Sequence, residues 1–148
     1  MKRIFWHVLI LSVVAFALHL VWELLHIPLY TGYEHLSPTL PISIYATSGD
    51  VLYTLGVFVF VSVANRSWNW ATRIHSREVA WLAATGLLIA LFVEYKALAL
   101  ARWEYVDAMP IIPFTNVGLS PIAQMTILLP LSFFIAAALS NRCSKYLP

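Results

Sequence analysis

The sequence predicts an all-α integral membrane protein, a four-helix bundle that forms one domain over residues 1–148. Two observations predict this class. Of the 148 residues, 61% are hydrophobic and only 11% are charged, and the mean hydropathy of +0.79 is too high for a soluble domain. In addition, four apolar runs approach or exceed the roughly 20 residues that a helix needs to cross a bilayer. These predicted spans lie near residues 4–27, 42–64, 79–100 and 121–139.

The first span raises the question of a secretory signal peptide, because Met-Lys-Arg precedes an apolar run with small residues at Ala15 and Ala17. The apolar run continues beyond Ala17, so we expect an uncleaved membrane span. The connection to the second span, residues 28–41, holds three prolines and a glycine, which predicts a short structured loop.

The third connection, residues 101–121, is long enough for an interfacial segment or a re-entrant cap. At its end, Ser120 and Pro121 are typical of an N-cap followed by proline in the first helical position. Pro130 is then expected to kink the fourth span.

Orientation follows from the basic residues. Seven of the nine Lys and Arg residues lie before span 1, between spans 2 and 3, or after span 4. The positive-inside rule therefore predicts that both termini are cytoplasmic, in a multi-pass protein of the cell (inner) membrane.

Polar residues form stripes inside these apolar spans. His19, Glu23 and His26 lie within about 40° of one another on one helical face. On span 2 the polar stripe is Ser43, Thr47, Asp50 and Thr54. On span 3, Glu94 belongs to a stripe of small residues that includes Gly86 and Ala90, and small residues let membrane helices approach closely.

These stripes share one depth in the predicted orientation. Glu23, Asp50, Glu94 and Gln124 lie about 6 to 12 Å below the outer boundary at 1.5 Å per residue. Acids within a span are costly to insert, so a functional role is their default interpretation. The sequence therefore predicts a polar pocket in the outer half of the bundle, with these four residues and His19 inside it.

The predicted catalytic residues are His19, Glu23, Asp50 and Glu94, which suit acid–base chemistry on a hydrophobic substrate. The same four residues could bind a divalent metal, because three carboxylates confined together need a cation or bound protons to offset their charge. Lys96 could also supply that charge, or could extend to the interface. The predicted ligand-binding residues are His26, Thr47, Lys96, Arg102, Trp103 and Gln124, although Gln124 is also typical of a contact between helices.

Three classes of function remain open from the residues alone. One is a small enzyme acting on a lipid-like molecule, a second is a proton- or ion-coupled carrier, and the third is a non-enzymatic subunit or binding protein. We expect a membrane lipid or another hydrophobic small molecule as partner, and a carrier would require a homo-oligomer. The formal charge is +2 and no basic cluster is present, so we expect no nucleic-acid partner. The single cysteine, Cys143, excludes an internal disulfide.

Two resemblances concern short strings of the sequence. HLVWE, GDVLY, RWEYVDAMP and GLSPIAQ together resemble small four-span bacterial membrane proteins, a resemblance that implies no mechanism. The HxxxE spacing of His19 and Glu23, with GDVLY at Gly49 to Tyr53, is similar to the EXPERA domain of sterol isomerases and sigma-2-type receptors, although the helices carrying the motifs follow another order. That similarity implies acid–base isomerisation or binding of a sterol-like ligand in a helical pocket.

Overall fold

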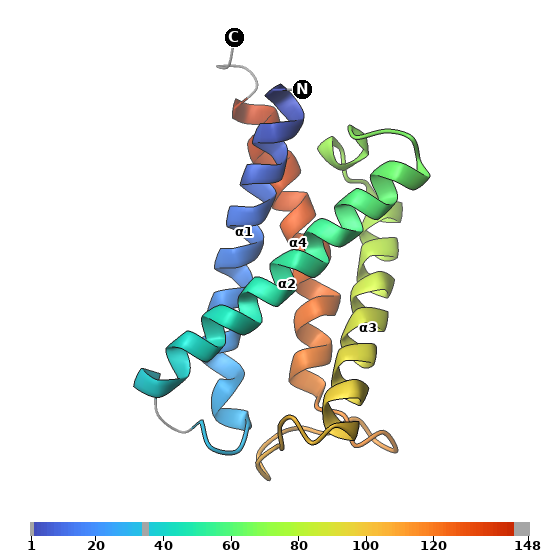
Figure 1. Ribbon diagram of the computed structural model, residues 1–148. Coiled ribbons are helices and arrows are strands. Elements are labelled where there is room, and N and C mark those ends of the chain that lie inside the picture. The colour runs from blue at the N-terminus through green and yellow to red at the C-terminus, as the bar shows by residue number, and fades with distance from the viewer. Residues whose placement is uncertain (1, 34–35, 144–148) are drawn as a thin grey trace.

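The computed structural model describes residues 2–33 and 36–143, and it confirms the all-α fold (Figure 1). Four long helices follow one another, and η1 and η2 are single 3₁₀ turns. Two isolated β-bridges are the only extended pairing among the described residues. The elements are α1 (Lys2–His26), η1 (Ile27–Leu29), α2 (Leu36–Ala64), η2 (Trp70–Thr72), α3 (Ser76–Ala99) and α4 (Leu119–Cys143).

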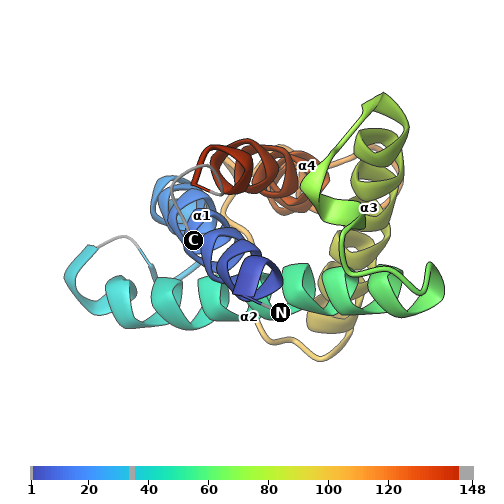
Figure 2. The ribbon, with the colours of Figure 1, turned by 90° about the horizontal axis from the view of Figure 1, so that it is seen from above.

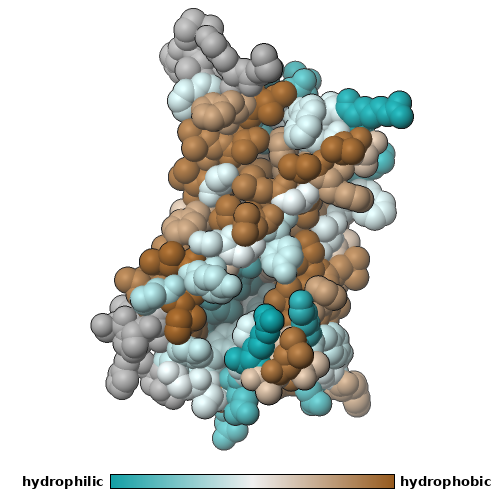
Figure 3. All heavy atoms as spheres, in the orientation of Figure 1, coloured by the Kyte–Doolittle hydropathy of each residue, from teal (hydrophilic) through white to brown (hydrophobic). Residues whose placement is uncertain are grey.

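All four helices are long and apolar enough to cross a membrane. Their outward surfaces carry large apolar side chains, for example those of Phe5, Leu52 and Phe92, each of which is exposed. Figure 3 shows brown apolar residues over much of the upper part of the visible face. Buried polar residues together with an apolar exterior fit a multi-pass membrane protein, because lipid replaces water around the helices.

Helix α2 begins at Leu36, so the predicted loop over residues 28–41 was wrong from residue 36 onward. Pro38 is the third residue of the helix, where an N–H would have no partner within the helix in any case. Pro41 lies inside the helix and removes one backbone hydrogen bond.

The helices pack in the pairs α1–α2, α1–α4 and α3–α4, whereas α2 and α3 make few contacts with each other. Figure 2 shows α2 and α3 on different sides of the bundle, with α1 and α4 completing it. At the α3–α4 contact, a Cβ on Gly86 would lie only 2.2 Å from the Met125 carbonyl oxygen. The small-residue stripe of span 3 therefore faces the bundle as predicted, and Gly86, Ala90, Glu94 and Ala97 are all buried.

The two halves of the bundle differ in the kind of residue that is buried in them. The half that contains the start of α1 and the end of α4 holds the main apolar core, in which Leu11, Phe58, Leu129 and Phe133 are buried. Arg3 on α1 donates a hydrogen bond to Asn141 on α4 at this end (3.1 Å). The opposite half, next to η1 and the loop between α3 and α4, contains most of the buried ionisable groups.

Candidate ligand-binding site

A cavity of about 540 Å³ lies in this second half, between α2 and α3. Its side walls are residues of these two helices, and Pro121, Gln124 and Met125 of α4 close the back. Because α2 and α3 hardly contact each other, the cavity is open on their side: Tyr45 lines it and is 83% exposed. In Figure 3 pale and teal residues surround a hollow below α2. The side walls are Ile42, Tyr45, Ala46, Gly49, Leu52 and Tyr53 on α2, and Ile89, Ala90 and Val93 on α3.

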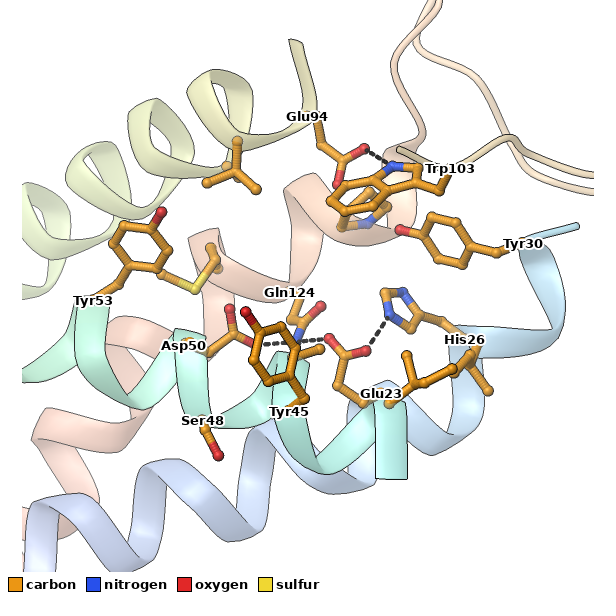
Figure 4. Close-up of a pocket in the computed structure, with 18 of the residues that line it drawn as sticks. Glu23, His26, Tyr30, Tyr45, Ser48, Asp50, Tyr53, Glu94, Trp103 and Gln124 are labelled. Atoms are coloured by element: carbon orange, nitrogen blue, oxygen red, sulfur yellow. Dashed lines mark hydrogen bonds and ion pairs between the residues drawn. The ribbon is translucent and has the colours of Figure 1, made fainter. Parts of the chain in front are cut away.

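At the base of the cavity, side chains from α1, α2 and α4 meet at the amide of Gln124 (Figure 4). Gln124 Nε2 lies 2.9 Å from Glu23 Oε1 and 2.9 Å from Asp50 Oδ2. It also lies 3.2 Å from His19 Nδ1, and that nitrogen is 3.2 Å from Asp50 Oδ2. We call these four residues, His19, Glu23, Asp50 and Gln124, the Gln124 cluster.

Counting donors assigns the protons of the Gln124 cluster. The amide has two N–H groups, and two carboxylates are the stronger acceptors within reach. Gln124 therefore donates to Glu23 and to Asp50, and His19 donates its Nδ1 proton to Asp50. The other ring nitrogen of His19, Nε2, is buried and has no partner among the described residues.

His26 connects the Gln124 cluster to the start of α4. Its Nε2 lies 3.3 Å from Glu23 Oε2, and its Nδ1 lies 2.9 Å from the hydroxyl of Ser120. With Ser120 donating to Nδ1, the Nε2 proton is directed to Glu23. The predicted N-cap role of Ser120 was wrong, since α4 begins at Leu119 and the Ser120 hydroxyl is used by His26.

Glu94 reaches the cavity from α3, on the side opposite Asp50 (Figure 4). Glu94 is only 4% exposed, and its Oε2 accepts hydrogen bonds from the Trp103 indole (3.3 Å) and from the Tyr105 hydroxyl. Burial, and the hydrogen bond to Glu94, raise the pKa of Tyr105 above its ordinary value. The phenol is therefore protonated at neutral pH and donates to the carboxylate.

The loop between α3 and α4 covers this end of the cavity. Thr31 N donates to the Glu104 carbonyl and Val106 N to the Leu29 carbonyl, each at 3.0 Å. These bonds hold Tyr30 beside Trp103 and Tyr105, with ring centroids 6.0 and 5.5 Å apart. The predicted cap is thus a segment paired with the short α1–α2 connection.

Seven of the ten predicted site residues line the cavity: Glu23, His26, Asp50, Glu94, Arg102, Trp103 and Gln124. His19 and Thr47 lie behind them, fully buried, and the Thr47 hydroxyl has no partner among the described residues. Lys96 does not reach the cavity. Its ammonium lies 6.0 Å from the centroid of the Phe92 ring on the exposed side of α3.

Seven further polar residues of the site were absent from the sequence prediction: Tyr30, Tyr33, Tyr45, Ser48, Tyr53, Tyr105 and Ser120. Tyr30 and Tyr105 follow the predicted ends of spans, which is the usual position of interfacial tyrosine in membrane proteins. At about 100° per residue, Tyr45 lies roughly 140° and Tyr53 roughly 60° around the helix from Asp50, so both lie outside the polar stripe. No pattern along the chain distinguishes these positions from ones in contact with lipid.

Residues 2–33 and 36–143 contain no group of three or more His, Cys, Asp and Glu side chains placed to hold one metal ion. The reason is visible in the Gln124 cluster. Three of the four predicted metal ligands, His19, Glu23 and Asp50, converge on an amide nitrogen instead of an open position. The fourth, Glu94, is held by Trp103 and Tyr105.

Comparison of the chain with models of known families, with curated proteins and with solved structures gives no match. Both resemblances noted in the sequence, including the one to the EXPERA domain, stay predictions.

Proposed function

We propose that this chain is a small membrane protein that binds a lipid-like molecule in the cavity between α2 and α3. The cavity itself is the observation that carries this proposal. Its volume of about 540 Å³ lies in the range of small-molecule sites, which combine apolar walls with a few polar groups. With the orientation inferred from the basic residues, it lies in the outer half of the cell membrane.

The arrangement of the helices supports entry from the bilayer. An amphipathic molecule can pass between α2 and α3, where no helix packing closes the cavity. Its apolar part would lie against Ile42, Leu52 and Val93, and its polar part against the carboxyl groups at the base. Because buried carboxyl groups need hydrogen bonds, a polar head group in this position is favourable for the protein as well as for the ligand.

Acid–base catalysis on this molecule is the enzymatic form of the same proposal. Glu23 and Asp50 line the cavity, and each is hydrogen-bonded to a histidine that can take up or release a proton. Glu94 and Tyr105 form a second acid–base pair on the opposite wall. A bound molecule would therefore lie between two proton-exchanging groups, as an isomerisation requires.

Filling the cavity tests the proposal. A Cβ on Gly49 would meet no atom within 4 Å, and Gly49 lines the cavity, so Gly49→Phe should occupy it without disturbing the helix contacts. Gly56→Phe is the matched control, because Gly56 lies on α2 in open space and outside the cavity lining. Lipids bound to protein purified in mild detergent are then quantified by native mass spectrometry.

We expect wild-type protein and Gly56→Phe to retain a bound lipid-like molecule that Gly49→Phe lacks, with all three proteins equally stable to heat. Equal lipid occupancy in the two variants would overturn the proposal. If a molecule is retained, the protein is incubated with an excess of that molecule, and the chemical structure of the molecule is then analysed. An unchanged molecule indicates binding, and a changed one indicates turnover.

A further inference from the structure

Two carboxylate oxygens of the cavity are free to bind a ligand. Asp50 uses Oδ2 for both His19 and Gln124, and Glu94 uses Oε2 for both Trp103 and Tyr105. The remaining oxygens, Asp50 Oδ1 and Glu94 Oε1, have no hydrogen-bond donor among the described residues. They come from α2 and α3, on opposite sides of the cavity (Figure 4).

No lysine or arginine among residues 2–33 and 36–143 forms an ion pair with these acids. Lys96 lies over the Phe92 ring on the exposed side of α3. Arg102 lines the cavity, but none of the ion pairs among the described residues joins it to Glu23, Asp50 or Glu94. The base of the cavity is thus acidic, and the exposed edge carries a cationic side chain with no ion-pair partner.

Aromatic side chains share the cavity with these charged groups. Tyr30, Tyr45 and Trp103 line the cavity, and the rings of Tyr30 and Trp103 meet edge to face with an interplanar angle of 88°. Aromatic faces beside carboxylates attract organic cations, because the ring quadrupole adds to the ionic attraction. The guanidinium of Arg102 instead attracts planar or tetrahedral anions such as carboxylate and phosphate.

We propose that the ligand is zwitterionic, with a primary ammonium group bound by the free oxygen of Glu94 and an anionic group, phosphate or carboxylate, bound by Arg102. This inference rests on the proposed function and names its ligand class. A primary ammonium has three N–H donors and can satisfy the free oxygen of Glu94. A trimethylammonium group has no donor, so it would leave that oxygen unsatisfied, and an anionic head group without an amine would be repelled by the carboxylates.

Two sources can supply this ammonium-and-phosphate chemistry: an aminophospholipid of the bilayer or a soluble phosphorylated amine. The experiment therefore titrates detergent-purified protein with short-chain phosphatidylethanolamine, phosphatidylcholine and phosphatidylglycerol, and with soluble phosphoethanolamine. Bound species are measured by native mass spectrometry. We expect phosphatidylethanolamine to bind about tenfold more tightly than the other two lipids, which corresponds to about 1.4 kcal/mol. If phosphoethanolamine binds as tightly as phosphatidylethanolamine, the ligand is a soluble molecule. If phosphoethanolamine does not bind, the ligand is a lipid. Either result, together with the preference for phosphatidylethanolamine, supports the ammonium site.

Two variants test the two charged regions separately. Glu94→Gln should remove the preference for phosphatidylethanolamine over phosphatidylcholine, because one ammonium acceptor is lost. Arg102→Gln should weaken the binding of phosphatidylethanolamine without strengthening the binding of phosphatidylcholine. Glu104→Gln and Arg73→Gln, which alter exposed charges outside the cavity lining, are the matched controls and should bind as wild type.

Failure of this inference differs from failure of the proposed function. Equal binding of the three lipids, blocked in each case by Gly49→Phe, would overturn the head-group assignment and leave lipid binding intact. Binding that Gly49→Phe does not affect would overturn both. An unchanged preference in Glu94→Gln and Arg102→Gln, with both variants folded, would also exclude the assignment of these residues.

Discussion

The amide nitrogen of Gln124 lies 2.9 Å from Oδ2 of Asp50, and this contact joins α4 to α2. These two helices both pack against α1 and make few contacts with each other. The same nitrogen lies 2.9 Å from Glu23 on α1. One neutral side chain therefore organises two buried acids from two helices. A buried amide between two carboxylates satisfies both with hydrogen bonds, but it does not offset their negative charge.

Replacing Gln124 by methionine should destabilise the protein. The variant keeps the side-chain length but removes both donors, so Glu23 and Asp50 each lose a hydrogen bond in a buried position. The expected loss is about 1–3 kcal/mol for each acceptor left unsatisfied. Thermal unfolding in detergent, followed by tryptophan fluorescence, measures it. Thr126→Val on the same helix is the control, since Thr126 bonds only to the carbonyl of its own helix at Ile122. A melting temperature equal to that of the control would contradict this role for Gln124.

Exchanging Gln124 for glutamate should create a metal site. The substitution replaces the central donor by a third carboxylate beside Glu23, Asp50 and His19, a mixed oxygen and nitrogen set that suits a divalent cation. Elemental analysis after incubation with Zn²⁺ or Mn²⁺ should find a stoichiometric ion in Gln124→Glu and none in wild type. A stoichiometric ion in wild-type protein would instead show that the amide moves aside and that the four predicted ligands bind metal.

Alanine at Gly86 should destabilise the α3–α4 contact, because its Cβ would lie 2.2 Å from the Met125 carbonyl oxygen. Backbone atoms cannot give way as flexible side chains do, so the two helices must separate. Gly56→Ala, whose Cβ would meet nothing within 4 Å, should leave the protein equally or more stable by about 0.5–1 kcal/mol, since alanine favours helix. The thermal unfolding temperatures of the two variants should therefore move in opposite directions, and a common shift would show that the contact is not close.

Single cysteines test the orientation. Asp107 lies in the loop next to the cavity and Ser76 at the start of α3, and both residues are exposed. In a background where Cys143 is replaced by serine, a membrane-impermeant thiol reagent added to intact cells should label Asp107→Cys and spare Ser76→Cys. The positive-inside rule is the physical reason, since it predicts that the basic connection between α2 and α3 lies in the cytoplasm. The reverse labelling pattern would place the cavity in the inner half of the membrane.

Most of the fold could be predicted from the sequence. Hydrophobic length alone located four helices, because a bilayer demands an apolar run of defined length from every span. The small-residue stripe through Gly86 and Ala90 predicted which face of α3 is buried, since close backbone approach excludes larger side chains. The start of α2 was missed, because proline near a helix N-terminus looks like a loop residue although it costs little there.

The candidate site was predictable in most of its ionisable members and in Trp103 and Gln124. Charged groups within an apolar span are exceptional enough to be recognised in sequence, which is why Glu23, Asp50 and Glu94 could be placed in one pocket. The tertiary structure alone decided how they are satisfied: Gln124 lies between the first two, Trp103 and Tyr105 bind the third, and Lys96 lies outside. Those partners are set by helix packing and by the pairing of two loops, contacts between residues up to about a hundred positions apart. A polar stripe in the sequence shows which face of a helix is polar. Which side chain contacts that face depends on the rotation of the neighbouring helix about its axis.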